Sequence, residues 1–571
     1  MSKFVIYQLL PRLFTNYEPN PVPNGSIEQN GCGKLNHITA KALRSIRSLG
    51  ATHVWYTGVL EHGTQTDYSR YGISRDNPAI VKGIAGSPYA VKDFYDIDPD
   101  LAEDVPHRMK EFEALVERTH KAGLKVIIDC VPNHVFRQYH SDNLPRGVRD
   151  FGADDHPEWA FSPLNNFYYI PNETFHPNFD LGDYIEYPAK ATGNDVFSAH
   201  PTRNDWYETV KLNYGVYYQG GGEKQFTPVP DTWHKMREVV RFWAKKGVDA
   251  FRCDMAEMVP HEFWNWMITA LKFEFPGIEF IAEVYNPMLY RTYLNAGFDY
   301  LYDKVGMYDT LRNILSRGHS TTGITHCWQS VQDISGKMLN FLENHDEQRI
   351  ASGFYCGSGI YTEPAMIIAA TLSTGPVMIY MGQELGELGM DFEGFSGIDG
   401  RTSIYDYWSL KTLRAWTNNG KFDGAHLTKD QAYLRDFYSR LLKLSLNERA
   451  IAEGRMYDLQ YAQSRPNYDT DKQFAYFRQY APQDAGKNFL RRQQLILIAV
   501  NFDDRTANFN VHVPEEALQY LGIGSGTRFT VENLIDEKQT IEPITLSPDT
   551  DIPLSLPAWK GAILKLKPEK K

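Results

Sequence analysis

The first two-thirds of the chain alternates short apolar runs with longer stretches whose apolar residues recur every three or four positions. Short apolar runs between turn residues are typical of buried strands, and the longer periodic stretches are typical of amphipathic helices. The pattern predicts strands over residues 4–11, 52–59, 124–132, 248–254, 278–285, 298–305, 338–346 and 376–382. It predicts helices over residues 38–50, 111–123, 232–247, 261–275 and 364–375.

Eight strands with helices between most of them predict a parallel sheet with right-handed connections. The count of eight favours an α/β fold of the (β/α)8 TIM-barrel type over an open doubly wound sheet. We expect the barrel to comprise residues 1–134 and 232–454. Residues 135–231 are rich in Asn, Pro, Asp, Tyr and Gly and too long for a plain loop, so they predict an inserted domain B after the third strand.

The pattern changes after residue 455, where short alternating strands are separated by turn residues. This pattern predicts a C-terminal all-β sandwich domain over residues 455–571. Its predicted strands cover residues 473–481, 494–502, 507–514, 528–535 and 561–567.

Charged or imidazole side chains close four of the predicted barrel strands. The active site of a (β/α)8 barrel lies at the carboxyl ends of its strands, and charges that close apolar strands are costly unless they are used or paired. We therefore expect these side chains to meet at one rim. They are Asp129, Asn133 and His134, then Arg252 and Asp254, then Glu283, and finally His345 and Asp346.

Arg252 and Asp254 lie two apart on one strand and share a face, so Arg252 can hold Asp254 ionised, as a nucleophile requires. Asp254 and Glu283 close adjacent strands, and their carboxyl groups could approach to about 5–5.5 Å, the separation of retaining glycosidases. Glu283 would then donate a proton and later remove one from water. His134 and His345 can donate hydrogen bonds to sugar hydroxyls, although either could equally be structural.

Four segments resemble, in order, the four signature regions of glycoside hydrolase family 13, the α-amylase family. They are DCVPNH (129–134), DAFRCDMAE (249–257), FIAEVY (280–285) and FLENHD (341–346). The resemblance implies a retaining α-glucan hydrolase that cleaves α-1,4 bonds of maltooligosaccharides through a covalent glycosyl-enzyme, with α-1,6 bonds as a second candidate linkage. It implies that Asp254 is the nucleophile, Glu283 the general acid/base and Asp346 the transition-state stabiliser. Tyr89, His134, Arg252 and His345 resemble the family's residues around the reacting sugar.

Two further segments resemble the neopullulanase and cyclomaltodextrinase branch of the family. They are KLN (211–213) and MAEMVPHEFW (255–264), and the second places Glu257 near the acceptor side as a substrate-binding residue. That branch usually carries an extra N-terminal β-domain that helps to form a dimer. This chain begins directly at its first predicted strand, so the resemblance is partial and implies no dimer.

Many members of the family carry an aspartate where Lys211 falls, and it ligates a structural calcium ion. The other ligand positions read Asn133 and Met258 here, and neither Lys nor Met is a ligand for a hard cation. We expect no metal or other cofactor to be required, and the Lys211 ammonium to take the place of the calcium ion by bonding to carbonyl oxygens. Lys211 could also be a plain surface lysine.

Composition narrows the remaining classes of function. The formal net charge of -12 argues against nucleic acid or an anionic membrane as a partner. Five scattered cysteines, no signal peptide and no long apolar run predict a cytoplasmic protein. Two alternatives stay open: an α-glucan transglycosylase or isomerase, such as a 4-α-glucanotransferase or trehalose-synthase-like enzyme that uses the same intermediate, and a non-catalytic sugar-binding relative.

Overall fold

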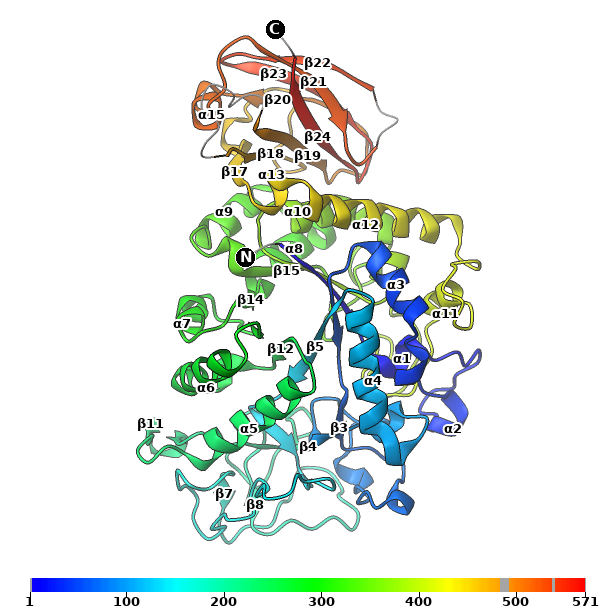
Figure 1. Cartoon of the computed structure of the whole chain (residues 1–571), viewed down its shortest axis with the longest axis vertical. Coiled ribbons are helices and arrows are strands. Elements are labelled where there is room, and N and C mark those ends of the chain that lie inside the picture. Colours follow the sequence, from blue (N-terminus) through cyan, green and yellow to red (C-terminus); the bar gives the residue numbers. More distant parts are fainter. Residues whose placement is uncertain (1–2, 483–491, 537–539, 570–571) are drawn as a thin grey trace.

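The structure is a computed structural model that describes residues 3–482, 492–536 and 540–569. Eight parallel strands close into a barrel (Figure 1). Each lies within a predicted strand, so the predicted TIM-barrel fold is confirmed. The strands are β1 (Val5–Leu9), β2 (His53–Tyr56), β5 (Lys125–Cys130), β12 (Ala250–Cys253), β13 (Glu279–Ala282), β14 (Tyr300–Tyr302), β15 (Met338–Phe341) and β16 (Val377–Tyr380).

Helices surround the barrel and bury their apolar faces against it (Figure 1). The five predicted helices are present as α3 (Ala40–Leu49), α4 (Arg108–Lys121), α5 (Asp231–Lys245), α6 (His261–Glu274) and α10 (Glu363–Thr371). The sequence pattern missed α7 (Tyr290–Asn295), α8 (Asp309–Arg317), α9 (Thr322–Ser330) and α12 (Lys429–Asn447). Both ends of α3 carry sequence signals of a helix terminus. The Thr39 side chain caps the first turn, and Gly50 ends the helix in a left-handed conformation.

The register between neighbouring barrel strands determines how far along the barrel axis the candidate site residues lie. Asp129 of β5 lies directly beside Arg252 of β12, and Arg252 lies beside Ile281 of β13. Asp254 and Glu283 follow the last residues of β12 and β13. Because parallel strands end at the same side of the barrel, these side chains are presented at one rim.

The segment between β5 and α5 contains short strands and one 3-10 turn, joined by irregular chain. β6 (His134–Phe136) pairs antiparallel with β9 (Thr209–Lys211), and β7 (Tyr169–Ile170) pairs with β8 (Ala189–Lys190). The segment supplies Phe136, Phe175 and Tyr207 to a small apolar cluster that it shares with Ile80 and Val81. Figure 1 shows it packed below α5 at one end of the barrel. The exact domain limits at residues 135 and 231 stay a prediction.

The C-terminal part forms an antiparallel six-stranded sheet and a two-stranded sheet with a core between them. The five predicted strands are present as β18 (Gln473–Tyr480), β19 (Gln494–Asn501), β20 (Ala507–Val513), β21 (Thr527–Asn533) and β24 (Gly561–Pro568). The sequence pattern missed β17 (Arg455–Asp458), β22 (Thr540–Leu546) and β23 (Thr550–Leu556). The last two contain Pro543 and Pro553, which argue against a strand. β22 tolerates its proline because it is an edge strand with a register shift.

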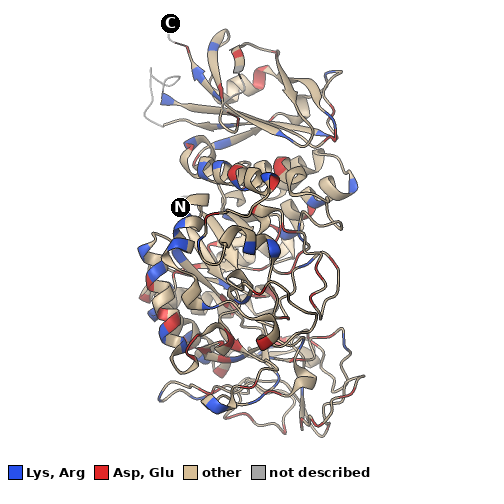
Figure 2. Ribbon diagram, turned by 90° about the vertical axis from the view of Figure 1, so that its right-hand side faces the viewer, with Lys and Arg blue, Asp and Glu red and all other residues tan. Residues whose placement is uncertain are grey.

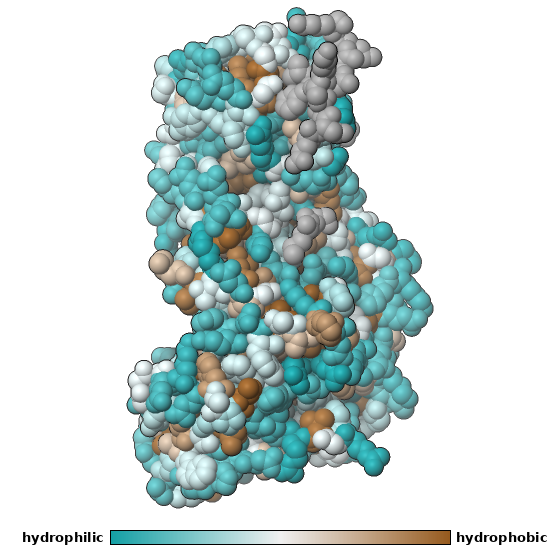
Figure 3. Space-filling view, turned by 60° about the vertical axis from the view of Figure 1, so that its left-hand side comes forward, coloured by the Kyte–Doolittle hydropathy of each residue, from teal (hydrophilic) through white to brown (hydrophobic). Residues whose placement is uncertain are grey.

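The outer surface is polar and carries both charge signs. Figure 2 shows Lys and Arg interleaved with Asp and Glu on the outer helices, and Figure 3 shows mainly hydrophilic atoms with small apolar groups. In the part of the chain that the structure describes, no helix is both long enough and apolar enough to cross a bilayer.

Candidate active site

A pocket of about 240 Å³ lies at the carboxyl rim of the barrel strands. Its lining contains all three residues predicted to act chemically and two of the predicted sugar contacts. They are Asp254, Glu283, Asp346, Tyr89 and His134. Five segments that are far apart in the sequence therefore converge on one cavity.

Arg252 holds two of the acids together from beneath the pocket. Its Nη1 lies 2.7 Å from Oδ1 of Asp254, and its Nη2 lies 2.7 Å from Oε1 of Glu283. Nη1 is also 3.6 Å from Oδ1 of Asp129. The side chain is 1% exposed, so these charges interact with little screening by water. The sequence predicted only the contact with Asp254.

The electrostatic environment of Asp254 is set by opposing effects. Burial raises the pKa of Asp254 well above its ordinary value, the Arg252 guanidinium acts to lower this pKa, and the charge of Glu283 acts to raise it. Arg252 is therefore the group that favours the ionised form a nucleophile needs.

Glu283 is held by its neighbours as well as by Arg252. Its Oε2 accepts a hydrogen bond of 2.7 Å from the backbone N–H of Met255, and its Oε1 accepts one of 2.6 Å from the Tyr285 hydroxyl. Met255 adopts a left-handed conformation with φ 42° and ψ 44°. Such a conformation is rare for a residue other than glycine, and it persists only where the surroundings impose it, as at active sites. Here the residue after the predicted nucleophile turns its N–H toward the predicted acid.

Asp346 is paired with His345. The imidazole Nε2 lies 3.0 Å from Oδ2 of Asp346, and Nδ1 lies 2.8 Å from the amide nitrogen of Gln8. Because an amide NH₂ only donates, Nδ1 accepts and Nε2 carries a proton toward Asp346. Partial removal of Asp346 from water acts to raise its pKa, but His345, Arg252 and Arg401 together outweigh this effect, and the pKa falls to about 2.

Tyr89 and His345 form one stacked unit at the pocket wall. Their ring centroids lie 5.0 Å apart with an interplanar angle of 20°. The Tyr89 hydroxyl donates to Oδ1 of Asp129, at 3.2 Å. Tyr89 lines the pocket, and His345 supports it from behind. His134 also lines the pocket, and burial lowers its pKa to about 3, so it is neutral at ordinary pH.

Several pocket residues were not found from the sequence. Lys82, Trp206, Glu208, Tyr285 and Tyr405 also line the cavity. Tyr285 could have been found, because it lies two residues after Glu283, the spacing that keeps side chains on one side of an extended chain. The others lie in irregular segments that carry no periodic signal. Lys82 and Glu208 form an ion pair of 2.9 Å with little exposure to water.

Glu257 does not line this cavity, as far as the described part of the chain defines it. Its Oε2 accepts a hydrogen bond of 3.0 Å from the backbone N–H of Asn286, and it does not line the pocket. The structure therefore gives Glu257 a local structural contact, while its predicted role on the acceptor side stays a prediction.

Lys211 is buried beside the pocket, which excludes a plain surface lysine. Its ammonium donates to Oδ1 of Asn133 at 2.7 Å and lies 2.6 Å from Oδ1 of Asp195. The Asn133 amide donates to the carbonyl oxygen of Gly193 at 2.8 Å. Burial lowers the pKa of Lys211, and Asp195 acts to raise it. The acceptors are thus a side-chain amide oxygen and a carboxylate.

A separate group of buried acids has the spacing of metal ligands. Oxygen atoms of Glu61, Asp93 and Asp96 lie within 4.8 Å of one another. However, Lys92 and Arg108 each place a cationic nitrogen 3.9 Å from a Glu61 oxygen, and Arg108 also pairs with Asp96. These two cations offset part of the negative charge, so the group alone does not establish a metal site.

A family model described as the α-amylase catalytic domain matches residues 8–440. The chain belongs to the α-amylase family. The match includes every candidate site residue discussed above and the segment between β5 and α5. This family membership confirms the resemblance of the four sequence segments and makes the chain an enzyme of the glycoside hydrolase class.

Individual relatives are distant. Alpha-amylase 3 of Dictyoglomus thermophilum is 24% identical over 401 residues, which cover 66% of this chain and 70% of the relative. Neopullulanase 2 of Thermoactinomyces vulgaris is 22% identical over 400 residues, which cover 67% of this chain and 57% of the relative. The crystal structure of a maltogenic α-amylase, AmyB, from Thermotoga neapolitana superposes with a TM-score of 0.62 at 17% identity and covers 98% of both chains. At this identity the superposition shows a shared fold.

Proposed function

We propose that this α-amylase-family protein hydrolyses α-1,4 glucosidic bonds of maltooligosaccharides with retention of the anomeric configuration. The observation that carries the proposal is the single guanidinium of Arg252 bound to both Asp254 and Glu283, with Asp346 in the same pocket. Retaining glycosidases require two carboxyl groups close together, one as nucleophile and one as proton donor.

The arrangement supports a two-step reaction. The reacting sugar lies against the Tyr89 ring, and Glu283 gives a proton to the glycosidic oxygen as an Asp254 oxygen bonds to the anomeric carbon. The bond to the leaving sugar breaks in the same step. Water then attacks the glycosyl-enzyme, Glu283 takes its proton, and Asp254 leaves as a carboxylate. Asp346, with its low pKa, is a fixed negative charge beside the positive charge that develops on the sugar ring.

Lys211 accounts for the absence of a metal requirement in this proposal. Its ammonium is already bound to Asn133 and Asp195, where a calcium ion would need oxygen ligands. A lysine ammonium and a calcium ion cannot both use the Asn133 oxygen at close range. We propose that the ammonium ties Asn133 at the end of β5 to the segment around Asp195 without a cofactor.

Transglycosylation is a second candidate reaction of the same site. Trp206, Tyr285 and Tyr405 surround the pocket with aromatic surface that could hold an acceptor sugar in place of water. The same glycosyl-enzyme serves both reactions, and only the acceptor differs. A non-catalytic binding role is the less favoured alternative, because all three acids point to one cavity.

The product profile tests these alternatives. The protein is incubated separately with maltose, maltotriose, pullulan and cyclodextrin, and the Asp254→Asn variant is the control. We expect shorter saccharides from maltotriose and their loss in the variant. Oligomers longer than maltotriose would favour transfer, and no turnover of any of the four would contradict the proposal. The five free cysteines suit a reducing compartment, so we also propose a cytoplasmic location.

A further inference from the structure

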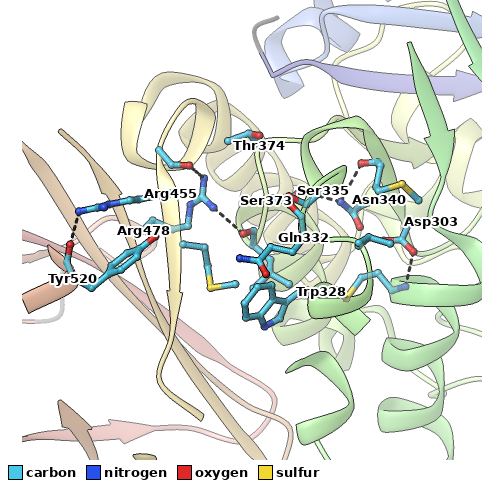
Figure 4. A pocket seen from close by; sticks show the side chains of 16 residues that line it. Asp303, Trp328, Gln332, Ser335, Asn340, Ser373, Thr374, Arg455, Arg478 and Tyr520 are labelled. Atoms are coloured by element: carbon cyan, nitrogen blue, oxygen red, sulfur yellow. Dashed lines mark hydrogen bonds between the residues drawn. The ribbon is translucent and has the colours of Figure 1, made fainter. Parts of the chain in front are cut away.

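A second cavity lies between the barrel and the C-terminal sheets. Its volume is about 220 Å³, close to the 240 Å³ of the catalytic pocket, and its lining shares no residue with that pocket. Figure 4 shows Trp328 and Gln332 from the barrel side facing Arg455 and Tyr520 from the C-terminal part. If the catalytic pocket holds one sugar unit, this cavity has room for one as well.

Trp328 gives this cavity a flat apolar surface, and Tyr520 lines its other side. Trp328 of α9 is partly exposed, and its Nε1 donates to Oδ2 of Asp458 at 2.8 Å, which fixes the ring between the two parts of the chain. Tyr520 of α15 (Glu515–Leu521) is 40% exposed, but the Arg455 guanidinium lies 4.2 Å and the Tyr457 ring centroid 5.0 Å from its ring centroid, so Trp328 is the ring that a ligand can stack on. Rings with apolar faces and polar edges suit the C–H faces of a saccharide.

Polar groups with spare bonding capacity surround these rings. In the described parts of the chain, the side chains of Gln332 and Thr374 have no hydrogen-bond partner, and both line the cavity. The buried amide of Asn340 makes two hydrogen bonds that are both 3.4 Å long. Sugar hydroxyls both donate and accept, so they match amides and hydroxyls better than an apolar ligand does.

The two guanidinium groups that line the cavity already donate to protein oxygen atoms. Arg455 donates from Nε and Nη2 to Oε1 of Gln479, and Arg478 donates to the carbonyl oxygens of Leu372 and Ala450. Asp303 adds an acid whose pKa burial raises to about 6. The N–H groups of these guanidinium groups are therefore largely taken up by protein oxygen atoms, which leaves Gln332, Thr374 and Asn340 as polar groups that a saccharide can bind.

We propose that this cavity is a second, non-catalytic saccharide site that holds one glucosyl unit of an α-glucan. The identity of the sugar rests on the proposed function, whereas the site itself rests on the cavity between Trp328 and Tyr520. A chain bound here would be kept at the surface of the enzyme between cleavage events.

Titration calorimetry with maltotetraose tests the proposal in the Glu283→Gln variant, which prevents turnover. We expect two binding events, of which Tyr89→Ala weakens one and Trp328→Ala weakens the other by about tenfold or more. Trp328→Phe keeps a ring and should retain the second event within about threefold. A single event, or a second event unaffected by Trp328→Ala, would overturn the proposal.

Ser335→Trp is an independent variant if Trp328→Ala lowers the melting temperature. Ser335 lines the cavity and is half-buried, so a tryptophan there fills the space and leaves the Trp328–Asp458 bond intact. It should abolish the second event and leave turnover of maltotriose by the otherwise unchanged enzyme within about twofold. Competition by inorganic phosphate would overturn the proposal in favour of an anion site. If the parent enzyme turns over maltotriose but maltotetraose shows only one binding event, the second site is refuted and the proposed function stands. If two binding events are seen but the parent enzyme shows no turnover, the proposed function is refuted and the second site stands.

Discussion

Nη2 of Arg252 lies 2.7 Å from Oε1 of Glu283, while Nη1 of the same guanidinium holds Asp254. A planar guanidinium presents its two terminal nitrogens in a fixed fork, so it sets the relative positions of the two acids as well as their charge. A lysine ammonium would supply the charge without the fork. Arg252 therefore links the predicted nucleophile to the predicted proton donor.

This linkage predicts the pH dependence of activity. Burial raises the pKa of Asp254 and Arg252 acts to lower it, so Arg252→Met should raise it further. Because attack requires ionised Asp254, activity falls as pH falls through this pKa, and the acid limb of kcat/KM should move to higher pH. Asp346 has a pKa of about 2 in the parent, and His345 and Arg401, which also lower it, remain in the variant, so Asp346 should stay ionised in this range.

Arg252→Lys is the matched variant for this pH experiment. It should keep the acid limb of kcat/KM nearer to that of the parent, because it retains a positive charge. Its kcat should fall, because an ammonium group lacks the two fixed terminal nitrogens that position Asp254 and Glu283. Profiles of kcat/KM are recorded below the melting temperature of each variant. An unchanged acid limb in Arg252→Met would contradict the assigned role of Arg252.

The chemical roles of the acids predict large losses of rate. Asp254→Asn and Glu283→Gln should each lower kcat on maltotriose by about 10³-fold or more, since each removes a group that forms or transfers a bond. Glu262→Gln is the control, because Glu262 pairs with Lys224 on the surface of α6. It should stay within about twofold. Far-UV circular dichroism checks the fold, and near-normal turnover of either active-site variant would remove its assigned role.

Hydrophobic periodicity and charged strand ends in the sequence were enough to predict the barrel and most of the candidate site. All eight barrel strands and the residues that close them could be identified, because buried parallel strands are continuous apolar runs and their charged ends stand out. β23 was missed because Pro553 interrupts its pattern. Lys82 and Glu208 were missed because tertiary contacts bring two irregular segments together, and no local pattern encodes that meeting.

The buried ammonium of Lys211 predicts a loss of stability rather than of chemistry. Lys211→Ala removes a partner from Asn133 and from Asp195, which should lower the free energy of unfolding by about 2–3 kcal/mol. Lys224→Ala, an exposed lysine, should change it by less than about 0.5 kcal/mol. Denaturant titration measures both. Equal stability of the two variants would contradict the structural role, and a rise in the parent's melting temperature with added calcium would contradict the metal-free proposal.

The ion pair between Lys82 and Glu208 predicts an effect on substrate binding. Both side chains line the catalytic pocket, and neither contacts the reacting acids in the structure. Lys82→Ala should raise KM for maltotriose about tenfold and leave kcat within about threefold. The matched Glu208→Gln variant removes the other charge and should act in the same direction. A fall in kcat at unchanged KM would instead indicate a role in the chemical step.

The most direct test of the account is to trap the glycosyl-enzyme. The protein is inactivated with a fluorinated α-glucosyl fluoride whose intermediate hydrolyses slowly, then digested, and its peptides are analysed by mass spectrometry. The account predicts one added fluoroglycosyl group on the peptide that contains Asp254, and none in the Asp254→Asn variant. Inactivation with the label on another residue, or turnover without any labelled peptide, would contradict it.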